Sequence, residues 1–175
     1  MYLSFEPKKN SLCESADSQS TKYSVSELMV DPVIFNPFQH NSEKAPVLLW
    51  LQGGPGGSSL FGLFNENGPL QVTKDLKVIK RSSSWSLTHH IIYIDNPVGT
   101  GFSFTKKDKC YAKNQDNVAT DLYFAMTQFF TMFPNLKKND FYVTGESYAG
   151  KYVPALTYKI HTLNPKATEK INLKG

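Results

Sequence analysis

Three short apolar runs stand out along the chain, and a loop rich in glycine, asparagine or serine follows each of them. The runs are 47–51 (VLLWL), 91–94 (IIYI) and 141–144 (FYVT). A continuous apolar run of this length is typical of a strand that is buried on both faces of a parallel sheet. The pattern therefore predicts three strands, with the loops that follow them gathered at one edge of the sheet.

Between the second and third runs, apolar side chains recur at three- and four-residue spacing. They are Val118, Leu122, Ala125, Met126, Phe129 and Phe130. This period predicts an amphipathic helix over 116–133, closed by Pro134. The third run leads directly through 145–150 (GESYAG) into another helix-like stretch. Strands that alternate with helices in this way predict an α/β protein.

The first part of the chain lacks this organisation. Residues 1–24 are polar, and 25–46 contain three prolines among short apolar runs. We therefore divide the chain into a poorly specified N-terminal segment, 1–44, and an α/β region, 45–175. No signal peptide is visible, because the N-terminus lacks the required apolar core. No window approaches the roughly 18 consecutive apolar residues of a membrane span.

Composition narrows the function classes. Of 175 residues, 40% are hydrophobic and 13% are aromatic, which is enough for one core. The net charge of +4 comes from scattered lysine pairs rather than from a basic stripe, so a nucleic-acid partner is not expected. Cys13 and Cys110 have the spacing of neither a metal motif nor a redox motif. No metal or cofactor is therefore expected.

Ser147 lies in the turn between the third predicted strand and its helix. Gly145 and Gly150 flank it with residues that tolerate crowded or left-handed backbone. Such a turn can hold a serine hydroxyl out at the top of a parallel sheet, with the N–H of Tyr148 placed to stabilise an oxyanion. The alternative is a glycine-bounded turn of any α/β protein, because Ala149 breaks the strict Gly-x-Ser-x-Gly spacing.

Three longer motifs together resemble those of the serine carboxypeptidases, an α/β-hydrolase family of acidic compartments. The motifs are LLWLQGGPGGSSLFGLFNENGP, YIDNPVGTGFSF and FYVTGESYAGKYVPA, and they occur in the family's order. The resemblance runs from about residue 45 to Gly175 and is closest to the vitellogenic-carboxypeptidase-like branch. It implies an α/β-hydrolase fold, of which this chain is expected to hold the N-terminal half of the sheet with the nucleophile turn.

The resemblance also implies roles for individual residues. Ser147 would attack a peptide carbonyl and form an acyl-enzyme that water releases. Gly54 and Tyr148 would donate their backbone N–H groups to the oxyanion. The group that holds the substrate's C-terminal carboxylate maps to Trp50, Gln52, Glu66 and Glu146. Two glutamates repel a carboxylate unless they bind protons, so this group favours acidic conditions. Without the resemblance, Gly54 would be interpreted as a turn glycine and Glu66 as an exposed acid in a loop.

Two positions depart from the common family pattern. Gln52 stands where the family usually has Asn, and Gly57 where it usually has Cys. Glutamine keeps the amide donor on a longer stem, whereas the usual disulfide of that cysteine cannot form here. Both departures also occur in the vitellogenic-like branch, so they mark a subfamily.

The residues that would activate Ser147 are not evident. In α/β-hydrolases the acid and then the histidine follow the serine, but only Glu169 and His161 do so here, with no aspartate. An unbroken helix would place His161 roughly 20 Å from Ser147. We expect His40, His89 and His90 at the surface or at strand edges. The chain is therefore expected to be an N-terminal part of a longer protein and to be inactive alone.

For the complete protein, the expected function is hydrolysis of the C-terminal peptide bond of peptides or proteins at acidic pH. The resemblance implies a lysosomal or secreted location. Two alternatives stay open: a non-catalytic member of the family that acts as a binding protein, and an acyltransferase on the same scaffold. The sequence indicates neither the oligomeric state nor the preferred substrate side chain.

Overall fold

The computed structural model describes residues 30–31, 44–105 and 107–175. Most of the N-terminal segment 1–44, with Cys13 and His40, lies outside the described residues. The strands are β1 (Val30–Asp31), β2 (Val47–Leu51), β3 (Leu70–Val72), β4 (Val78–Lys80), β5 (His90–Ile94) and β6 (Phe141–Gly145). The long helices are α1 (Gln115–Met132) and α2 (Ala149–Leu163), and shorter helical turns span Gly62–Glu66, Trp85–Leu87, Asp108–Cys110, Pro134–Leu136 and Asn164–Lys166.

The three predicted strands form the centre of one sheet, in the order β1-β5-β2-β6. β2 pairs in parallel with both β5 and β6, so that Leu49 lies between Ile92 and Val143. β1 pairs antiparallel with β5. The sequence prediction is confirmed, although β5 starts one residue earlier, at His90, whose side chain is only 5% exposed. His90 was expected at the surface or at a strand edge: it is the first residue of β5, and it is buried because the strand pairing carries its backbone into the sheet.

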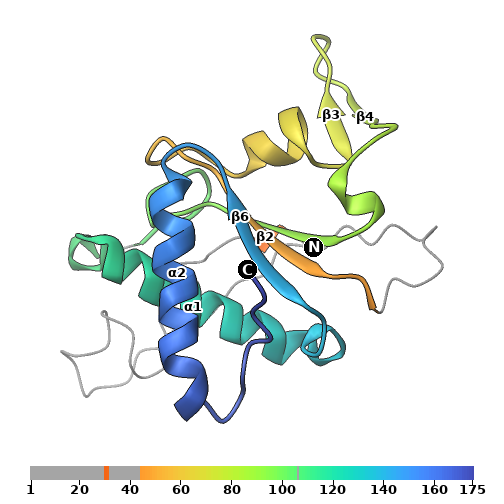
Figure 1. Cartoon of the computed structure of the whole chain (residues 1–175). Helices are drawn as coiled ribbons and strands as arrows, with labels where there is room; N and C mark the ends of the chain where they lie inside the picture. The colour runs from red at the N-terminus through yellow and green to blue at the C-terminus, as the bar shows by residue number, and fades with distance from the viewer. Residues whose placement is uncertain (1–29, 32–43, 106) are drawn as a thin grey trace.

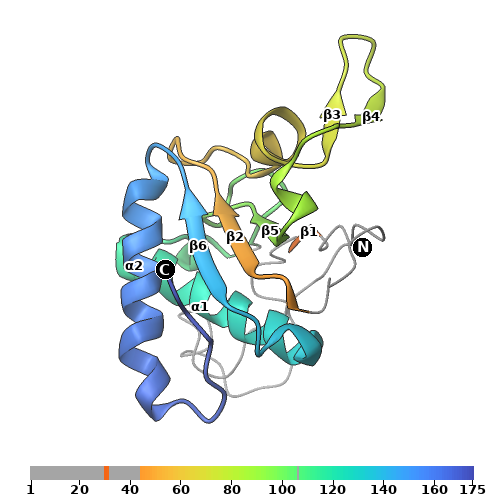
Figure 2. The same ribbon diagram turned by 45° about the vertical axis from the view of Figure 1, so that its right-hand side comes forward.

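The end of the chain adds to the β6 edge of this sheet. The Phe141 N–H donates to the Asn172 carbonyl at 2.9 Å, and the Val143 N–H donates to the Gly175 carbonyl at 2.8 Å. Leu173 bridges Phe141 in the parallel sense. The C-terminal segment consequently lies alongside β6, as two views of the molecule show (Figures 1 and 2).

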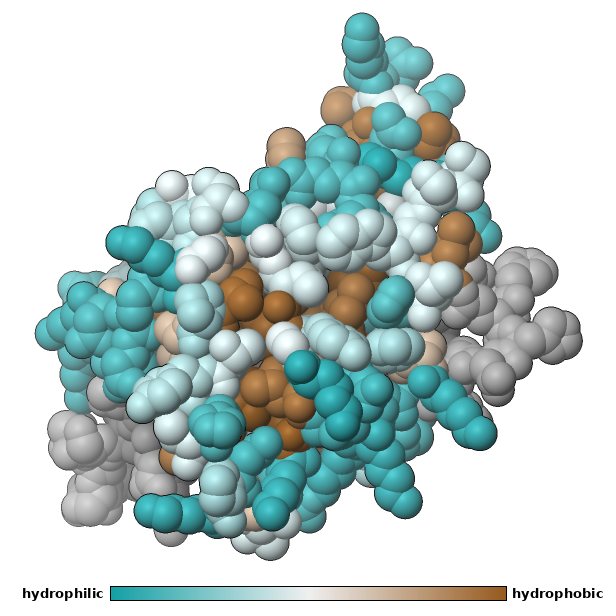
Figure 3. Space-filling view, viewed as in Figure 1, coloured by the Kyte–Doolittle hydropathy of each residue, from teal (hydrophilic) through white to brown (hydrophobic). Residues whose placement is uncertain are grey.

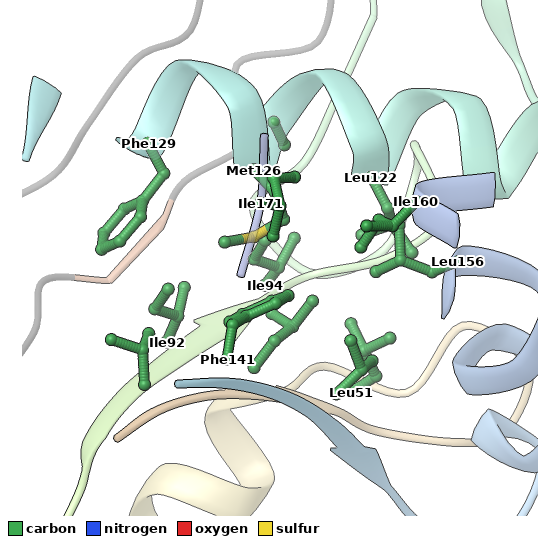
Figure 4. Packing of buried hydrophobic residues seen from close by; sticks show 14 of the residues in the cluster. Leu51, Ile92, Ile94, Leu122, Met126, Phe129, Phe141, Leu156, Ile160 and Ile171 are labelled. Atoms are coloured by element: carbon green, nitrogen blue, oxygen red, sulfur yellow. The ribbon is translucent and has the colours of Figure 1, made fainter. Parts of the chain in front are cut away.

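Both long helices cover the same face of the sheet. Alternate residues of each strand point toward them, and the core between sheet and helices is close-packed (Figure 4). Its labelled members are Leu51, Ile92, Ile94, Leu122, Met126, Phe129, Phe141, Leu156, Ile160 and Ile171. Each such side chain contributes about 1.5–3 kcal/mol on burial. The predicted helix 116–133 is confirmed as α1, which begins at the Asn114 cap, where Oδ1 accepts from the Asn117 N–H at 2.9 Å.

A smaller apolar cluster covers the opposite face of the sheet. It consists of Leu48, Trp50, Leu63, Ile91 and Tyr93, with Leu60, Phe64 and Tyr142 packed at its edge. The π-helical turn Gly62–Glu66 supplies part of this cover. The turn therefore brings Glu66 close to the end of β2, where the predicted site residues lie.

The antiparallel β3–β4 hairpin projects from the rest of the molecule (Figure 2). Leu76 at its tip is 86% exposed, and Val78 and Ile79 are exposed as well. The space-filling view shows brown atoms on the projecting part below its teal tip, with a further brown area in the middle of the same face (Figure 3). No helix in the described ranges is long and apolar enough to cross a membrane.

Candidate active site

Ser147 lies at the sharp turn between β6 and α2. Its φ of 55° is left-handed, a conformation that costs a non-glycine residue about 1–2 kcal/mol. The turn also needs Gly145, because a Cβ there would lie 2.5 Å from the Leu51 carbonyl oxygen and 2.6 Å from Ala149 Cβ. The side chain of Ser147 is exposed to solvent. The strained strand-turn-helix of the sequence prediction is present, and the nucleophilic role of Ser147 stays a prediction.

The glycine loop after β2 packs directly against this turn. A Cβ on Gly53 would lie 2.8 Å from both Ser147 Cβ and the Tyr148 nitrogen, so only glycine fits there. The next residue, Gly54, has a φ of +110° and is exposed. Among the backbone hydrogen bonds between described residues, neither the Gly54 nor the Tyr148 N–H is a donor. Both amides predicted to bind an oxyanion are therefore available to one.

Asp95 ties this glycine loop to the loop that follows β5. One carboxylate oxygen accepts from the Ser58 hydroxyl at 2.6 Å and from the Ser59 N–H at 2.9 Å, and the other accepts from the Phe102 N–H at 2.9 Å. Asp95 is only 3% exposed. Sequence reasoning missed this role, although an aspartate directly after a buried strand was a visible sign of it.

The four residues assigned to carboxylate binding come together at the carboxyl ends of β2 and β6. The Trp50 indole N–H donates to Gln52 Oε1 at 3.0 Å, which turns the amide nitrogen of Gln52 toward Glu146. That nitrogen donates in a short hydrogen bond to Glu146 Oε1. Gln52 is held in turn because its backbone N–H donates to the Ser59 hydroxyl at 3.1 Å. The longer glutamine stem thus reaches Glu146 with its amide orientation defined.

Glu66 completes this group from the π-helical turn. Burial raises the pKa of its carboxyl, and the hydrogen bond and negative charge of Glu146 raise it further, while a hydrogen bond from Gln52 acts in the opposite direction. Glu66 Oε2 is buried and has no hydrogen-bond partner within the described part of the chain. Partial burial and a neighbouring acid both disfavour the charged form of a carboxyl, so Glu66 holds its proton more tightly than a free glutamate. We call Trp50, Gln52, Glu66 and Glu146 the carboxylate group below.

His161, His90 and Glu169 lie away from this turn. Helix α2 continues through Pro154, so the exposed His161 lies roughly 20 Å along the helix from Ser147. His90 pairs with Val47 at the amino end of the parallel sheet, opposite the edge that carries Ser147. Glu169 forms an ion pair with Lys137. Cys110 is disulfide-bonded. Within the described ranges, no three His, Cys, Asp or Glu side chains are grouped to hold a metal.

A parallel sheet with a left-handed serine turn and an adjoining glycine loop defines an α/β-hydrolase. The chain belongs to the serine carboxypeptidase family, whose model matches residues 34–175. It is 61% identical over 141 residues to the probable serine carboxypeptidase CPVL of Mus musculus, and 57% identical over 141 residues to the venom serine carboxypeptidase of Apis mellifera. The vitellogenic carboxypeptidase of Aedes aegypti is 55% identical over 139 residues. The predicted family is confirmed.

These matches cover 79–81% of this chain but only 29–30% of the length of the relatives. Among solved structures, the crystal structure of Kex1(delta)p, a prohormone-processing carboxypeptidase from Saccharomyces cerevisiae, superposes with a TM-score of 0.76 at 29% identity. That match covers 94% of this chain and 36% of the other. The predicted α/β-hydrolase fold is confirmed, and the chain represents a part of it.

Proposed function

We propose that the whole protein is a serine-type carboxypeptidase that removes the C-terminal residue of peptides or proteins. The observation that carries this proposal is the carboxylate group beside Ser147. Gln52 and the two glutamates are hydrogen-bonded to one another and lie next to the left-handed serine turn. A general esterase needs the serine turn but has no use for two linked carboxyls next to it.

In the proposed reaction the substrate's terminal carboxylate binds at the carboxylate group. The Gln52 amide has a second hydrogen to donate, and a protonated Glu66 has one. The preceding carbonyl then lies over Ser147, whose hydroxyl oxygen attacks it. The N–H groups of Gly54 and Tyr148 stabilise the resulting oxyanion, the C-terminal amino acid departs, and water hydrolyses the acyl-enzyme.

This attack requires a base that accepts the Ser147 proton and an acid that orients the base. Neither is found beside the turn among the described residues, where His161 and His90 lie far along the helix and at the other end of the sheet. We propose that both come from a part of the whole protein beyond these 175 residues, and that this chain has no peptidase activity alone.

The proposed substrates are free peptide C-termini, and the proposed working conditions are acidic. The raised pKa of Glu66 supports the second point, since its proton is needed when an anionic substrate binds. A lysosomal or secreted location is part of the same proposal. It is supported by similarity to a protein named for venom in Apis mellifera.

The deciding experiment incubates the whole protein at about pH 5 with an N-blocked dipeptide and measures the free C-terminal amino acid. We expect release from wild type and none from Ser147→Ala. Binding of the dipeptide without release would instead support a non-catalytic binding protein. Transfer of the acyl group to an added alcohol, with little hydrolysis, would support an acyltransferase.

A further inference from the structure

Arg81 lies on the segment after β4 and donates three hydrogen bonds to main-chain carbonyls. Its Nη1 donates to the Glu66 carbonyl at 2.7 Å and its Nη2 to the Phe64 carbonyl at 3.0 Å. Its Nε donates to the Leu70 carbonyl at 3.2 Å. Two of these acceptors belong to the π-helical turn that carries Glu66, so one guanidinium holds the end of that turn.

The carbonyls at the end of the π-helical turn need hydrogen-bond donors from outside the turn. The Asn67 and Gly68 N–H groups both donate to the Gly62 carbonyl, at 3.0 and 3.2 Å. The last carbonyls of a helical turn have no partner within the turn, and π-helical turns are rare and occur often at functional sites. Arg81 supplies charged donors to the carbonyls of Phe64 and Glu66, and charge-assisted hydrogen bonds are about twice as strong as neutral ones.

The other side of the turn is pressed against the carboxylate group. A Cβ on Gly62 would lie 2.3 Å from Trp50 Nε1, so the turn backbone is in close contact with the indole. After the turn, Asn67 is held on both sides: its side chain accepts from the Tyr93 hydroxyl at 2.7 Å and its carbonyl from the Trp85 N–H at 3.0 Å. Glu66 therefore lies on a segment held between Trp50 and Arg81.

Arg81 acts on the main chain and not on the glutamate side chain. Its guanidinium bonds the carbonyl of Glu66, whereas the carboxyl of Glu66 faces Gln52 and Glu146. An arginine directly on that carboxyl would favour its ionised form and oppose its protonation. The arrangement thus places a positive charge behind the turn while the carboxyl stays beside another acid.

We propose that Arg81 is the positioning residue of the carboxylate group: it holds the π-helical turn so that Glu66 faces Glu146 and can meet a substrate carboxylate. This inference rests on the proposed carboxypeptidase function. It assigns a role in substrate binding to a residue that contacts neither Ser147 nor the oxyanion amides.

The test compares Arg81→Ala, Arg81→Lys and the matched control Lys74→Ala in the whole protein. Lys74 is an exposed cation on the same hairpin segment. One substrate is an N-blocked dipeptide acid, and the other is a blocked amino-acid ethyl ester without a terminal carboxylate. For Arg81→Ala we expect the KM of the acid to rise roughly tenfold, with the KM and kcat of the ester unchanged within about twofold. Lys74→Ala should leave both substrates unaffected.

A double-mutant cycle separates positioning from general support of the fold. If Arg81 acts through Glu66, Arg81→Ala in a Glu66→Ala background should change the KM of the acid by less than about threefold, because no side chain remains there to be positioned. Fully additive effects, or equal losses on the acid and the ester, would overturn the inference. If Arg81→Ala does not fold, Arg81→Lys serves the same comparison, because lysine supplies donors without the planar fork, and a loss confined to the acid is still required. A wild-type protein that releases no amino acid would refute the proposed function instead.

Discussion

Replacement of Glu66 by Gln tests the protonation of Glu66 in the carboxylate group most directly. Burial and the neighbouring Glu146 raise the pKa of Glu66, so below that pKa its carboxyl is protonated and can donate a hydrogen bond. Above it the ionised carboxylate faces a substrate that is itself anionic. Glutamine reproduces the uncharged state of this side chain at every pH and keeps a hydrogen-bond donor. Glu66→Gln should therefore bind substrate as the wild type does at low pH.

The expected size of the change in KM follows from the protonation equilibrium of Glu66. Two unit charges about 4 Å apart repel by about 4 kcal/mol at an effective dielectric constant of about 20, which exceeds the roughly 2.7 kcal/mol of a hundredfold change in KM. Ionised Glu66 thus blocks substrate binding almost fully, and the protonated fraction sets the affinity. Above the pKa, the wild-type KM should rise about tenfold for each pH unit. The KM of Glu66→Gln should stay nearly constant.

The assay measures KM for a blocked dipeptide acid between about pH 5 and pH 7, with a blocked ethyl ester in parallel. Glu169→Gln is the matched control, because Glu169 pairs with Lys137 away from the site. The control should keep the wild-type pH dependence, and the ester should show none in any variant. A Glu66→Gln protein whose KM still climbs with pH, or an ester that follows the acid, would refute the reasoning.

Three further predictions concern the turn, the loop and α1. Ser147→Gly should raise the free energy of unfolding by about 1 kcal/mol in urea titrations while abolishing catalysis, because glycine adopts the φ of 55° without strain; a destabilised variant would contradict this. Gly53→Ala should lower kcat for acid and ester alike and cost about 1–3 kcal/mol of stability, since its Cβ would lie 2.8 Å from Ser147 Cβ; wild-type kcat would count against the close approach. Burial raises the pKa of Asp121 to about 6, so the folded state binds the extra proton and stability falls as pH rises from about 4 to 6, by at most about 3 kcal/mol. Asp121→Asn should remove that slope in unfolding curves recorded across this range, and an unchanged slope would assign it to other groups.

The sequence predicted the parts of the fold that bury apolar side chains in a regular period. The strands β2, β5 and β6 are continuous apolar runs, and α1 repeats at three- and four-residue spacing. The order of the strands was not predictable in the same way. β2 lies between β5 and β6 although β5 comes between them in the chain, and such neighbour relations depend on packing across the sheet rather than on local pattern.

The residues of the candidate site likewise include some that the sequence predicted and some that it did not. The residues of the carboxylate group were predicted by resemblance, and the structure brings Gln52 within hydrogen-bond reach of Glu146, 94 positions along the chain. Arg81 and Asp95 were not predicted. Arg81 follows a short, exposed strand with no apolar alternation, and its partners are main-chain carbonyls of a π-helical turn. Every residue has a main-chain carbonyl, so no sequence pattern indicates which carbonyls an arginine will bind.

The parallel pairing of β2 with β6 has a consequence for the size of the product. Leu51 lies opposite Gly145, so Gln52 and Glu146 leave neighbouring strands at the same level, and Ser147 follows one residue later. Adjacent strands are about 4.8 Å apart and one extended residue spans about 3.6 Å. In the proposed reaction, the space between the terminal carboxylate and the attacked carbonyl then accommodates a single amino acid. In that proposed reaction, the register between β2 and β6 would therefore limit the product to one residue in each cycle.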